Sequence, residues 1–178
     1  PVFPQDNFDL TDTPNYVGGV PILAPLFDNW VTGLNSPPGL ILPDAKVLYL
    51  FEDTNADFIN DRLIIEWNDV YHRDQIDTTS APVLKAGASP VTFQVILELN
   101  TFDRDGDITF NYVDLDTGSA FPAIADGGSA TVGGKDGSDN PIGIKQVSFN
   151  ATNTLIGSSR AIVARRALSD GNDQLIGG

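Results

Sequence analysis

Residues 91–99 read VTFQVILEL, and this stretch decides the fold class. Apolar side chains stand at every second position, and polar ones stand between them at Thr92, Gln94 and Glu98. A period of two sends one set of side chains into a core and the other into solvent. β-branched and aromatic residues also favour extended backbone. The stretch therefore predicts a half-buried β-strand.

Other segments repeat this pattern on both sides of it. Alternation or β-branched composition predicts further strands at 47–51, 63–67, 108–112, 129–132, 142–149 and 161–165. The segments between them are rich in Gly, Asp, Asn and Pro, which suit turns. No helical period is present, and 26–34 is expected to form one helical turn at most. We predict an all-β fold, an antiparallel two-sheet β-sandwich of jelly-roll type, with long loops and little helix.

The length of 178 residues fits one domain. We assign residues 1–168 to this domain. Residues 169–178 turn abruptly to small and polar side chains. They are expected to be a linker or the start of glycine- and aspartate-rich repeats.

Charge and composition limit the classes of partner and the location. There are 24 Asp and Glu against 10 Lys and Arg, and the formal net charge is −14. Such a surface repels phosphate, so nucleic acid is not an expected partner. The apolar stretches are shorter than the roughly 20 residues of a membrane-spanning helix, so no membrane insertion is expected. The chain has no Cys, which fits a bacterial protein secreted to the extracellular space or cell surface.

An acidic turn is the first candidate metal site. Asp103, Asp105 and Asp107 alternate with Arg104 and Gly106 between two predicted strands. Calcium takes 6–8 oxygen ligands, and a glycine permits a sharp bend between them. The spacing does not fit the twelve-residue loop of an EF-hand. A solvated Asp-Gly hairpin turn is the alternative interpretation.

A second loop repeats the alternate-oxygen pattern. Asp53, Asn55 and Asp57 lie between the predicted strands 47–51 and 63–67. Phe58 stands at the sixth position, where an EF-hand loop has Gly. A polar hairpin loop is therefore the preferred interpretation here. Any calcium bound at either loop is expected to be structural.

Catalytic motifs are missing from the sequence. His72 is the sole histidine, so a zinc site with several imidazoles is excluded within this chain. No Gly-x-Ser-x-Gly motif is present. We expect His72 to be an exposed loop residue, Trp67 to pack in the core, and the glycine pairs 127–128 and 133–134 to form turns. The chain is therefore predicted not to be an enzyme.

Several segments stand in an order that suggests a family. They are 24–30 (APLFDNW), 62–70 (RLIIEWNDV), 91–97 (VTFQVIL) and 106–112 (GDITFNY), followed by 128–133 and 147–150. Together, over roughly residues 20–150, they resemble the nidogen-like extracellular domain of animal matrix proteins and bacterial surface proteins. This resemblance implies an adhesive or scaffolding role without a catalytic centre. The chain departs from the animal pattern because it has no cysteines.

The end of the chain has a resemblance of its own. Residues 170–178 read DGNDQLIGG, which resembles the opening of the nonapeptide repeats of RTX proteins. Successive repeats of that kind hold calcium between them, so one incomplete repeat closes no site. A flexible linker is the alternative.

Three hypotheses about function follow. The first is a non-catalytic extracellular structural or adhesive module of a larger secreted or cell-surface protein. It would be calcium-stabilised and would contact a protein or glycan at the cell surface or matrix, or another copy of itself. The second is a carbohydrate-binding accessory domain of a secreted hydrolase, which requires an exposed Trp30 or Tyr71. The third is a hydrolase, which requires a cleft where His72 meets a Ser and an Asp.

Overall fold

The computed structural model describes residues 9–11, 20–33, 42, 44–102, 105–137, 144–166 and 173–177. Its strands are β1 (Ile22–Phe27), β2 (Trp30–Val31), β3 (Lys46–Glu52), β4 (Arg62–His72), β5 (Ile76–Asp77), β6 (Val83–Leu84), β7 (Val91–Glu98), β8 (Ile108–Asp114), β9 (Thr131–Lys135), β10 (Ile144–Phe149), β11 (Arg160–Arg166) and β12 (Asp173–Gly177). Two 3-10 turns, η1 (Arg73–Gln75) and η2 (Ala125–Gly127), are the helical elements of these ranges. None of the described elements is a helix long and apolar enough to span a membrane. The all-β prediction is confirmed.

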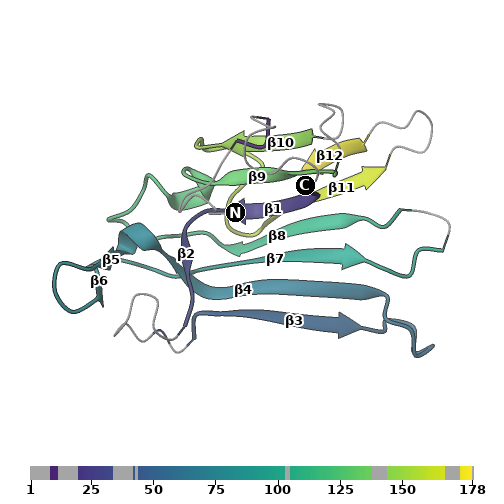
Figure 1. The fold of residues 1–178 in the computed structure, drawn as a ribbon, viewed down its shortest axis with the longest axis horizontal. Helices are drawn as coiled ribbons and strands as arrows, with labels where there is room; N and C mark the ends of the chain where they lie inside the picture. Colours follow the sequence, from purple (N-terminus) through teal and green to yellow (C-terminus); the bar gives the residue numbers. More distant parts are fainter. Residues whose placement is uncertain are drawn as a thin grey trace.

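The strands form two facing sheets (Figure 1). The small sheet has the order β1-β9-β10, and the large sheet has the order β12-β11-β8-β7-β4. Both β2 and β3 pair with β4, β3 along its first part and β2 at its end. A short hairpin, β5-β6, stands apart from both sheets. The strand pairs are antiparallel, as expected for a β-sandwich.

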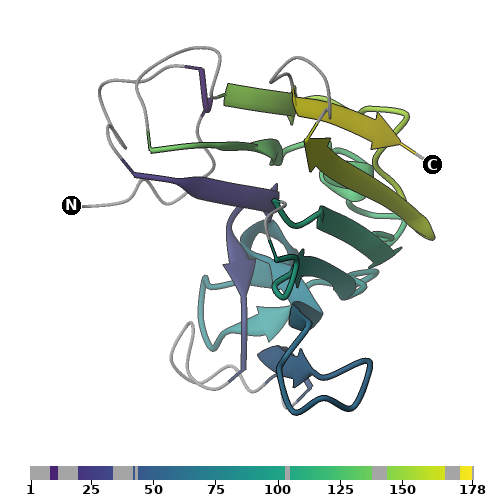
Figure 2. The same cartoon turned by 90° about the vertical axis from the view of Figure 1, so that its right-hand side faces the viewer.

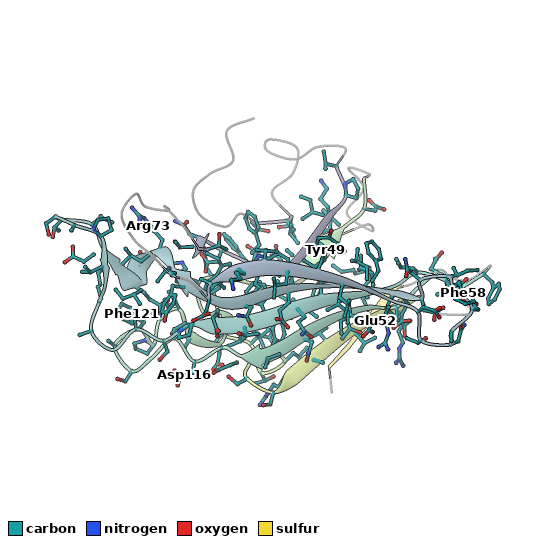
Figure 3. The ribbon with its side chains drawn as sticks, turned by 90° about the horizontal axis from the view of Figure 1, so that it is seen from below. Tyr49, Glu52, Phe58, Arg73, Asp116 and Phe121 are labelled. Carbon is teal, nitrogen blue, oxygen red and sulfur yellow. The ribbon has the colours of Figure 1, made fainter. Side chains whose placement is uncertain are left out.

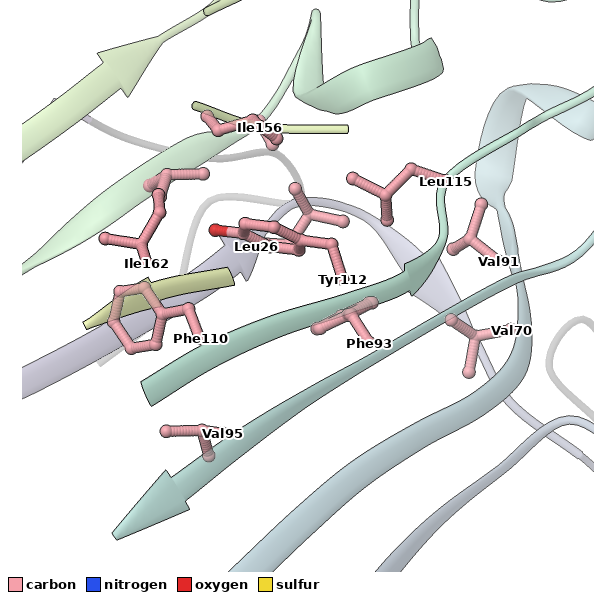
Figure 4. Packing of buried hydrophobic residues seen from close by; sticks show 12 residues of the cluster. Leu26, Val70, Val91, Phe93, Val95, Phe110, Tyr112, Leu115, Ile156 and Ile162 are labelled. Atoms are coloured by element: carbon pink, nitrogen blue, oxygen red, sulfur yellow. The ribbon is translucent and has the colours of Figure 1, made fainter. Parts of the chain in front are cut away.

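The core lies between the two sheets (Figure 4). Leu26 of β1 and Val132 of β9 face Phe93, Phe110 and Tyr112 of the large sheet, and all five are at most 3% exposed. Trp67 packs at the border of this cluster, with its ring stacked 4.9 Å from that of Phe93. The predicted core position of Trp67 is therefore confirmed.

Residues 26–33, the described part of 26–34, contain no helical turn, which agrees with the expectation of one turn at most. Here β1 ends at Phe27 and β2 follows at Trp30. Pro25 lies inside β1, where the register with β9 shifts between Ala24 and Phe27. Proline fits a strand at such an irregularity, because its missing N–H interrupts no regular ladder. The Pro25 carbonyl accepts a hydrogen bond from the Tyr112 hydroxyl at 2.8 Å, which ties β1 to the large sheet.

The structure corrects the interpretation of Gly133 and Gly134 as a turn. Both residues lie in β9, the central strand of the small sheet. The sequence predicts a strand at 129–132, but the strand begins at Thr131 and continues through the two glycines to Lys135. Gly133 is paired with Ala24 on one side and with Gln146 on the other. The two glycines therefore allow the neighbouring strands to pack closely against β9.

Residues near the end of the chain belong to the large sheet. The sequence suggests a linker or the start of repeats at 169–178, and residues 173–177 of this stretch form β12. β12 pairs with β11 over five residues, from Ile162 to Arg166. The large sheet therefore runs from β12 at one edge to β3 at the other (Figure 2).

Candidate binding surface

The β3 strand is an exposed apolar edge. It pairs with β4 on one side, and no described strand pairs with its other side. Five consecutive apolar side chains are 45–75% exposed: Val47, Leu48, Tyr49, Leu50 and Phe51. Proteins usually shorten, charge or cover such edges, because unpaired N–H and C=O groups attract another strand. A long apolar edge left open is therefore a candidate binding surface.

One face of β3 continues the core face of the large sheet. The register places Tyr49 opposite Ile65, then Val95, Phe110 and Ile162 on the successive strands. Residues directly opposite each other share a face. The exposed fraction along this row falls from 75% at Tyr49 to 3% at Val95 and 0% at Ile162. Tyr49 thus points to the core side of the sheet but lies beyond the cover of the small sheet.

The other face of β3 borders a polar row. Leu48 lies opposite Glu66 of β4, which is followed by Gln94 and Asn111. The Gln94 amide donates a hydrogen bond to Glu66, and the Asn111 amide donates one to Gln94 at 2.8 Å. These hydrogen bonds hold the polar side chains of the outer face in place next to β3. The exposed leucines of β3 therefore border an ordered polar surface.

The two ends of β3 carry opposite charges. Lys46 begins the strand and is exposed, and Glu52 ends it. Both lie on the outer face, because their partners on β4 are Asn68 and Arg62. Glu52 also forms an ion pair with Arg62, with 3.4 Å between Oε2 and Nη2. Figure 3 shows Tyr49 and Glu52 along the strand.

The loop after β3 contains one of the predicted calcium sites. Both carboxylate oxygens of Asp53 accept backbone N–H groups, from Ala56 and Phe58 at 2.7 Å each. The side-chain oxygens of Asn55 and Asp57 accept the N–H groups two residues further on. Oxygens of this loop thus stabilise the hairpin themselves, as the hairpin interpretation expects. Across the described ranges, no group of three or more His, Cys, Asp or Glu is placed to hold a metal ion.

The second acidic turn is described only in part, because Asp103 lies outside the described residues. Asp107 forms an ion pair with Arg165 of β11, with 2.9 Å between Oδ2 and Nε. Gly106 packs closely on β7, since a Cβ there would lie 2.0 Å from the carbonyl oxygen of Glu98. Calcium binding at Asp103, Asp105 and Asp107 stays a prediction.

Two phenylalanines extend the apolar surface at one end of the large sheet. Phe58, after β3, is 98% exposed, and Phe102, after β7, is 94% exposed. The two loops are side by side, because the Asp61 carboxylate accepts a hydrogen bond from the Asn100 amide at 3.1 Å. Both phenylalanines have left-handed backbone, with φ of 69° and 58°. Figure 3 shows Phe58 at this end of the sheet.

The left-handed backbone at Phe58 leads to a first prediction. Replacing Phe58 with glycine is expected to raise the free energy of unfolding by about 0.5 kcal/mol. The left-handed conformation costs an L-residue about 1–2 kcal/mol, which glycine avoids. The greater conformational freedom of glycine in the unfolded chain reduces this gain in stability by about 0.5–1 kcal/mol. Urea unfolding measures the change. Ile59→Gly is the matched control, because the backbone of Ile59 is outside the left-handed region. This variant should destabilise the fold. An equal loss of stability in both variants would contradict the prediction.

His72 is buried, which corrects the expectation of an exposed loop histidine. It is the last residue of β4 and is 5% exposed. The cause is a bulge: the register between β4 and β7 shifts between Trp67 and Val70, and Asp69 has a φ of 51°. One extra residue reverses the alternation that follows. Val70 and His72 therefore face the core, on the same side as Trp67.

A buried carboxylate connects His72 to Ser129. His72 Nε2 lies 3.1 Å from Asp28 Oδ1, and the Ser129 hydroxyl donates to Asp28 Oδ2 at 2.6 Å. The side chains of His72 and Asp28 are 6% and 4% exposed. Burial raises the pKa of Asp28, but the hydrogen bonds from His72 and Ser129 outweigh it, so the pKa is lowered overall.

This cluster does not have the geometry of a catalytic triad. In a triad the histidine contacts the serine directly, but here the carboxylate stands between them. The other ring nitrogen, Nδ1, accepts the N–H of Asp74 at 3.1 Å. Both ring nitrogens are therefore engaged, and Nε2 carries the proton donated to Asp28. The cluster ties the segment after β1 to the end of β4 and to the segment before β9.

Trp30 and Tyr71, the aromatic residues that the carbohydrate-binding hypothesis needs exposed, are partly buried. Trp30 donates from Nε1 to the Leu26 carbonyl at 2.7 Å, and its ring makes an edge contact with His72. Tyr71 is half-buried and packs beside Val31 and Ile76, and burial raises its pKa. Among the described residues, the exposed aromatic side chains lie instead on β3 and in the two neighbouring loops.

A polar cleft of about 570 Å³ lies next to the 3-10 turn η2. Asp116, Asp126, Asn153, Ser158 and Arg160 are among its lining residues. Asn153 is used in local structure, because its side chain bonds the backbone of Val147 and Leu155. No histidine is among its lining residues, and the Ser158 hydroxyl accepts the Leu115 N–H at 2.8 Å and donates to Asp114 Oδ1 at 3.2 Å.

No family model, curated protein or solved structure matches this chain.

Proposed function

We propose that this chain is a non-catalytic structural or adhesive module that binds another protein by strand addition at β3. The observation that carries the proposal is the run of five exposed apolar residues on an edge strand. An added strand gains affinity from main-chain hydrogen bonds and specificity from side chains on both faces. Both faces of β3 offer apolar side chains, Tyr49 on one and Leu48 on the other.

Other observations support a binding role over a catalytic one. The sole histidine is committed to the buried Asp28 cluster. The resemblance to nidogen-like domains favours adhesion, and the absence of Cys fits an extracellular location. The carbohydrate-binding alternative is weaker, because Trp30 and Tyr71 are packed against their neighbours.

Strand addition is tested with a labelled peptide. A capped fluorescent peptide with the sequence of residues 46–52 should bind the wild-type chain saturably in fluorescence anisotropy. The variant carrying Leu48→Lys and Leu50→Lys should lose this binding, because charge on an edge opposes pairing with another strand. Both leucines are about half exposed, so the fold should tolerate the change.

The matched control is Val83→Lys, which adds a lysine at a 51% exposed position of β6. This variant should bind the peptide as well as the wild type does. Equal binding by the β3 variant, or no binding by the wild type, would contradict the proposal.

A further inference from the structure

We infer that the strand added to β3 is β3 of a second copy, running antiparallel, with Tyr49 on the twofold axis. This inference rests on the proposed function and names its partner. It is drawn from the order of residues along β3, from the faces on which they lie and from the charges at its two ends.

The sequence of β3, KVLYLFE, is self-complementary about its centre. In an antiparallel pair centred on Tyr49, Lys46 faces Glu52 of the partner subunit. Val47 then faces the partner's Phe51, and Leu48 faces the partner's Leu50. Opposite charges and apolar pairs placed directly across from each other both stabilise sheets. The twofold axis repeats each of these contacts, so the two ion pairs form together.

The faces of β3 agree with this register. Val47, Tyr49 and Phe51 are opposite Trp67, Ile65 and Leu63, so they lie on the core side. Leu48 and Leu50 lie on the outer side with Lys46 and Glu52. A twofold axis perpendicular to the sheet keeps each set on its own side. Apolar side chains therefore meet apolar ones on both faces.

Other registers fit less well. A shift by one residue would place a core-side residue opposite an outer-side residue, which directly paired strands do not permit. A shift of the partner by two residues, in either direction, sets Lys46 against Leu50 or Leu48 against Glu52. Only the register centred on Tyr49 pairs both lysines with both glutamates.

Pairing of two β3 strands would bury apolar side chains that the small sheet leaves exposed on the core side of β3. Tyr49 and Phe51 make an edge contact, with 6.1 Å between ring centroids, and both remain about half exposed or more. In the pair, the two Tyr49 rings would meet across the axis, next to Phe51 from each copy. A pair of seven-residue strands is smaller than the standard interface of about 1,200–2,000 Å². The dimer should therefore dissociate on dilution.

The experiment is a charge exchange between two variants of the full chain. Sedimentation over a concentration series should show a dimer for the wild type. Lys46→Glu and Glu52→Lys should each weaken this dimer by about tenfold or more, because each sets like charges opposite each other twice. An equimolar mixture of the two variants should form dimers again, since every glutamate then faces a lysine.

Lys145→Glu on β10 makes the same change in net charge as Lys46→Glu but away from β3, so it should dimerise like the wild type. Dimers unaffected by the charge changes, or larger polymers built from β3 and the β12 edge, would overturn the inference. If the intact chain stays monomeric while the peptide still binds, the second copy is the wrong partner and strand addition stands. If neither binding occurs, both proposals fail.

Discussion

Replacing Asp28 with alanine is expected to lower the free energy of unfolding by about 3 kcal/mol or more. The substitution leaves the Nε2–H of His72 and the hydroxyl of Ser129 buried without their acceptor. It also removes the contact that joins the segment after β1 to β4 and to the start of β9. Chemical denaturation followed by far-UV circular dichroism measures the loss.

Asp28→Asn is the matched control, because the amide oxygen still accepts one of the two hydrogen bonds. This variant should lose clearly less stability than Asp28→Ala. Ser129→Ala removes one donor and leaves the bond to His72 intact, so it should cost about 1 kcal/mol. Equal stability of Asp28→Ala and the wild type would show that the cluster contributes nothing to the fold.

The lowered pKa of Asp28 gives this prediction a pH dependence. An unfolded aspartate has a pKa of about 3.9, and the folded value lies below it. The ionised carboxylate therefore contributes its full stability above pH 4–5, roughly, and loses it as the pH falls through the folded pKa. The stability difference between the wild type and Asp28→Asn should shrink over this acid range. A difference that grows on acidification would reverse the sign and contradict the assignment.

The sequence predicts the strands well where alternation is regular. β7, β8 and the first part of β4 lie where period-two patterns place them. The pattern fails after Trp67, because a bulge at Asp69 depends on backbone geometry that alternation does not encode. For this reason the burial of His72, and its contact with Asp28, could not be predicted.

The candidate surface shows a different limit of the sequence. Residues 47–51 are five apolar residues in a row, a pattern typical of a strand buried on both faces. The structure instead leaves this strand at the edge, because the small sheet covers the other end of the large one (Figure 2). Periodicity assigns residues to faces but does not say which strand has only one neighbour. The signal available in the sequence is the pair of opposite charges at Lys46 and Glu52.

The acidic loop after β3 shows that the sequence also does not predict how side chains are oriented. The sequence gives the spacing of Asp53, Asn55 and Asp57 but not the direction of their oxygens. In the structure those oxygens accept backbone N–H groups of the same loop. A hairpin of this kind and a calcium loop use similar residues, because both need several oxygens in a short turn.

Replacing Gly133 with alanine is expected to destabilise the fold by about 3–5 kcal/mol. A Cβ there would lie 2.3 Å from the carbonyl oxygen of Lys145 and 2.8 Å from Cα of Gln146, and its φ of 155° is strained for any other residue. Both neighbours are backbone atoms of β10, so relief requires β9 and β10 to separate, which weakens the cover of Val132 over the core. Gly134→Ala is the matched control, because its nearest contact of 3.4 Å is ordinary and the cost should stay below about 1 kcal/mol. Urea unfolding of the two variants compares them directly. Similar losses in both would mean that β10 does not approach Gly133 so closely, whereas a large loss at Gly133 alone would place the glycine pair within the sheet.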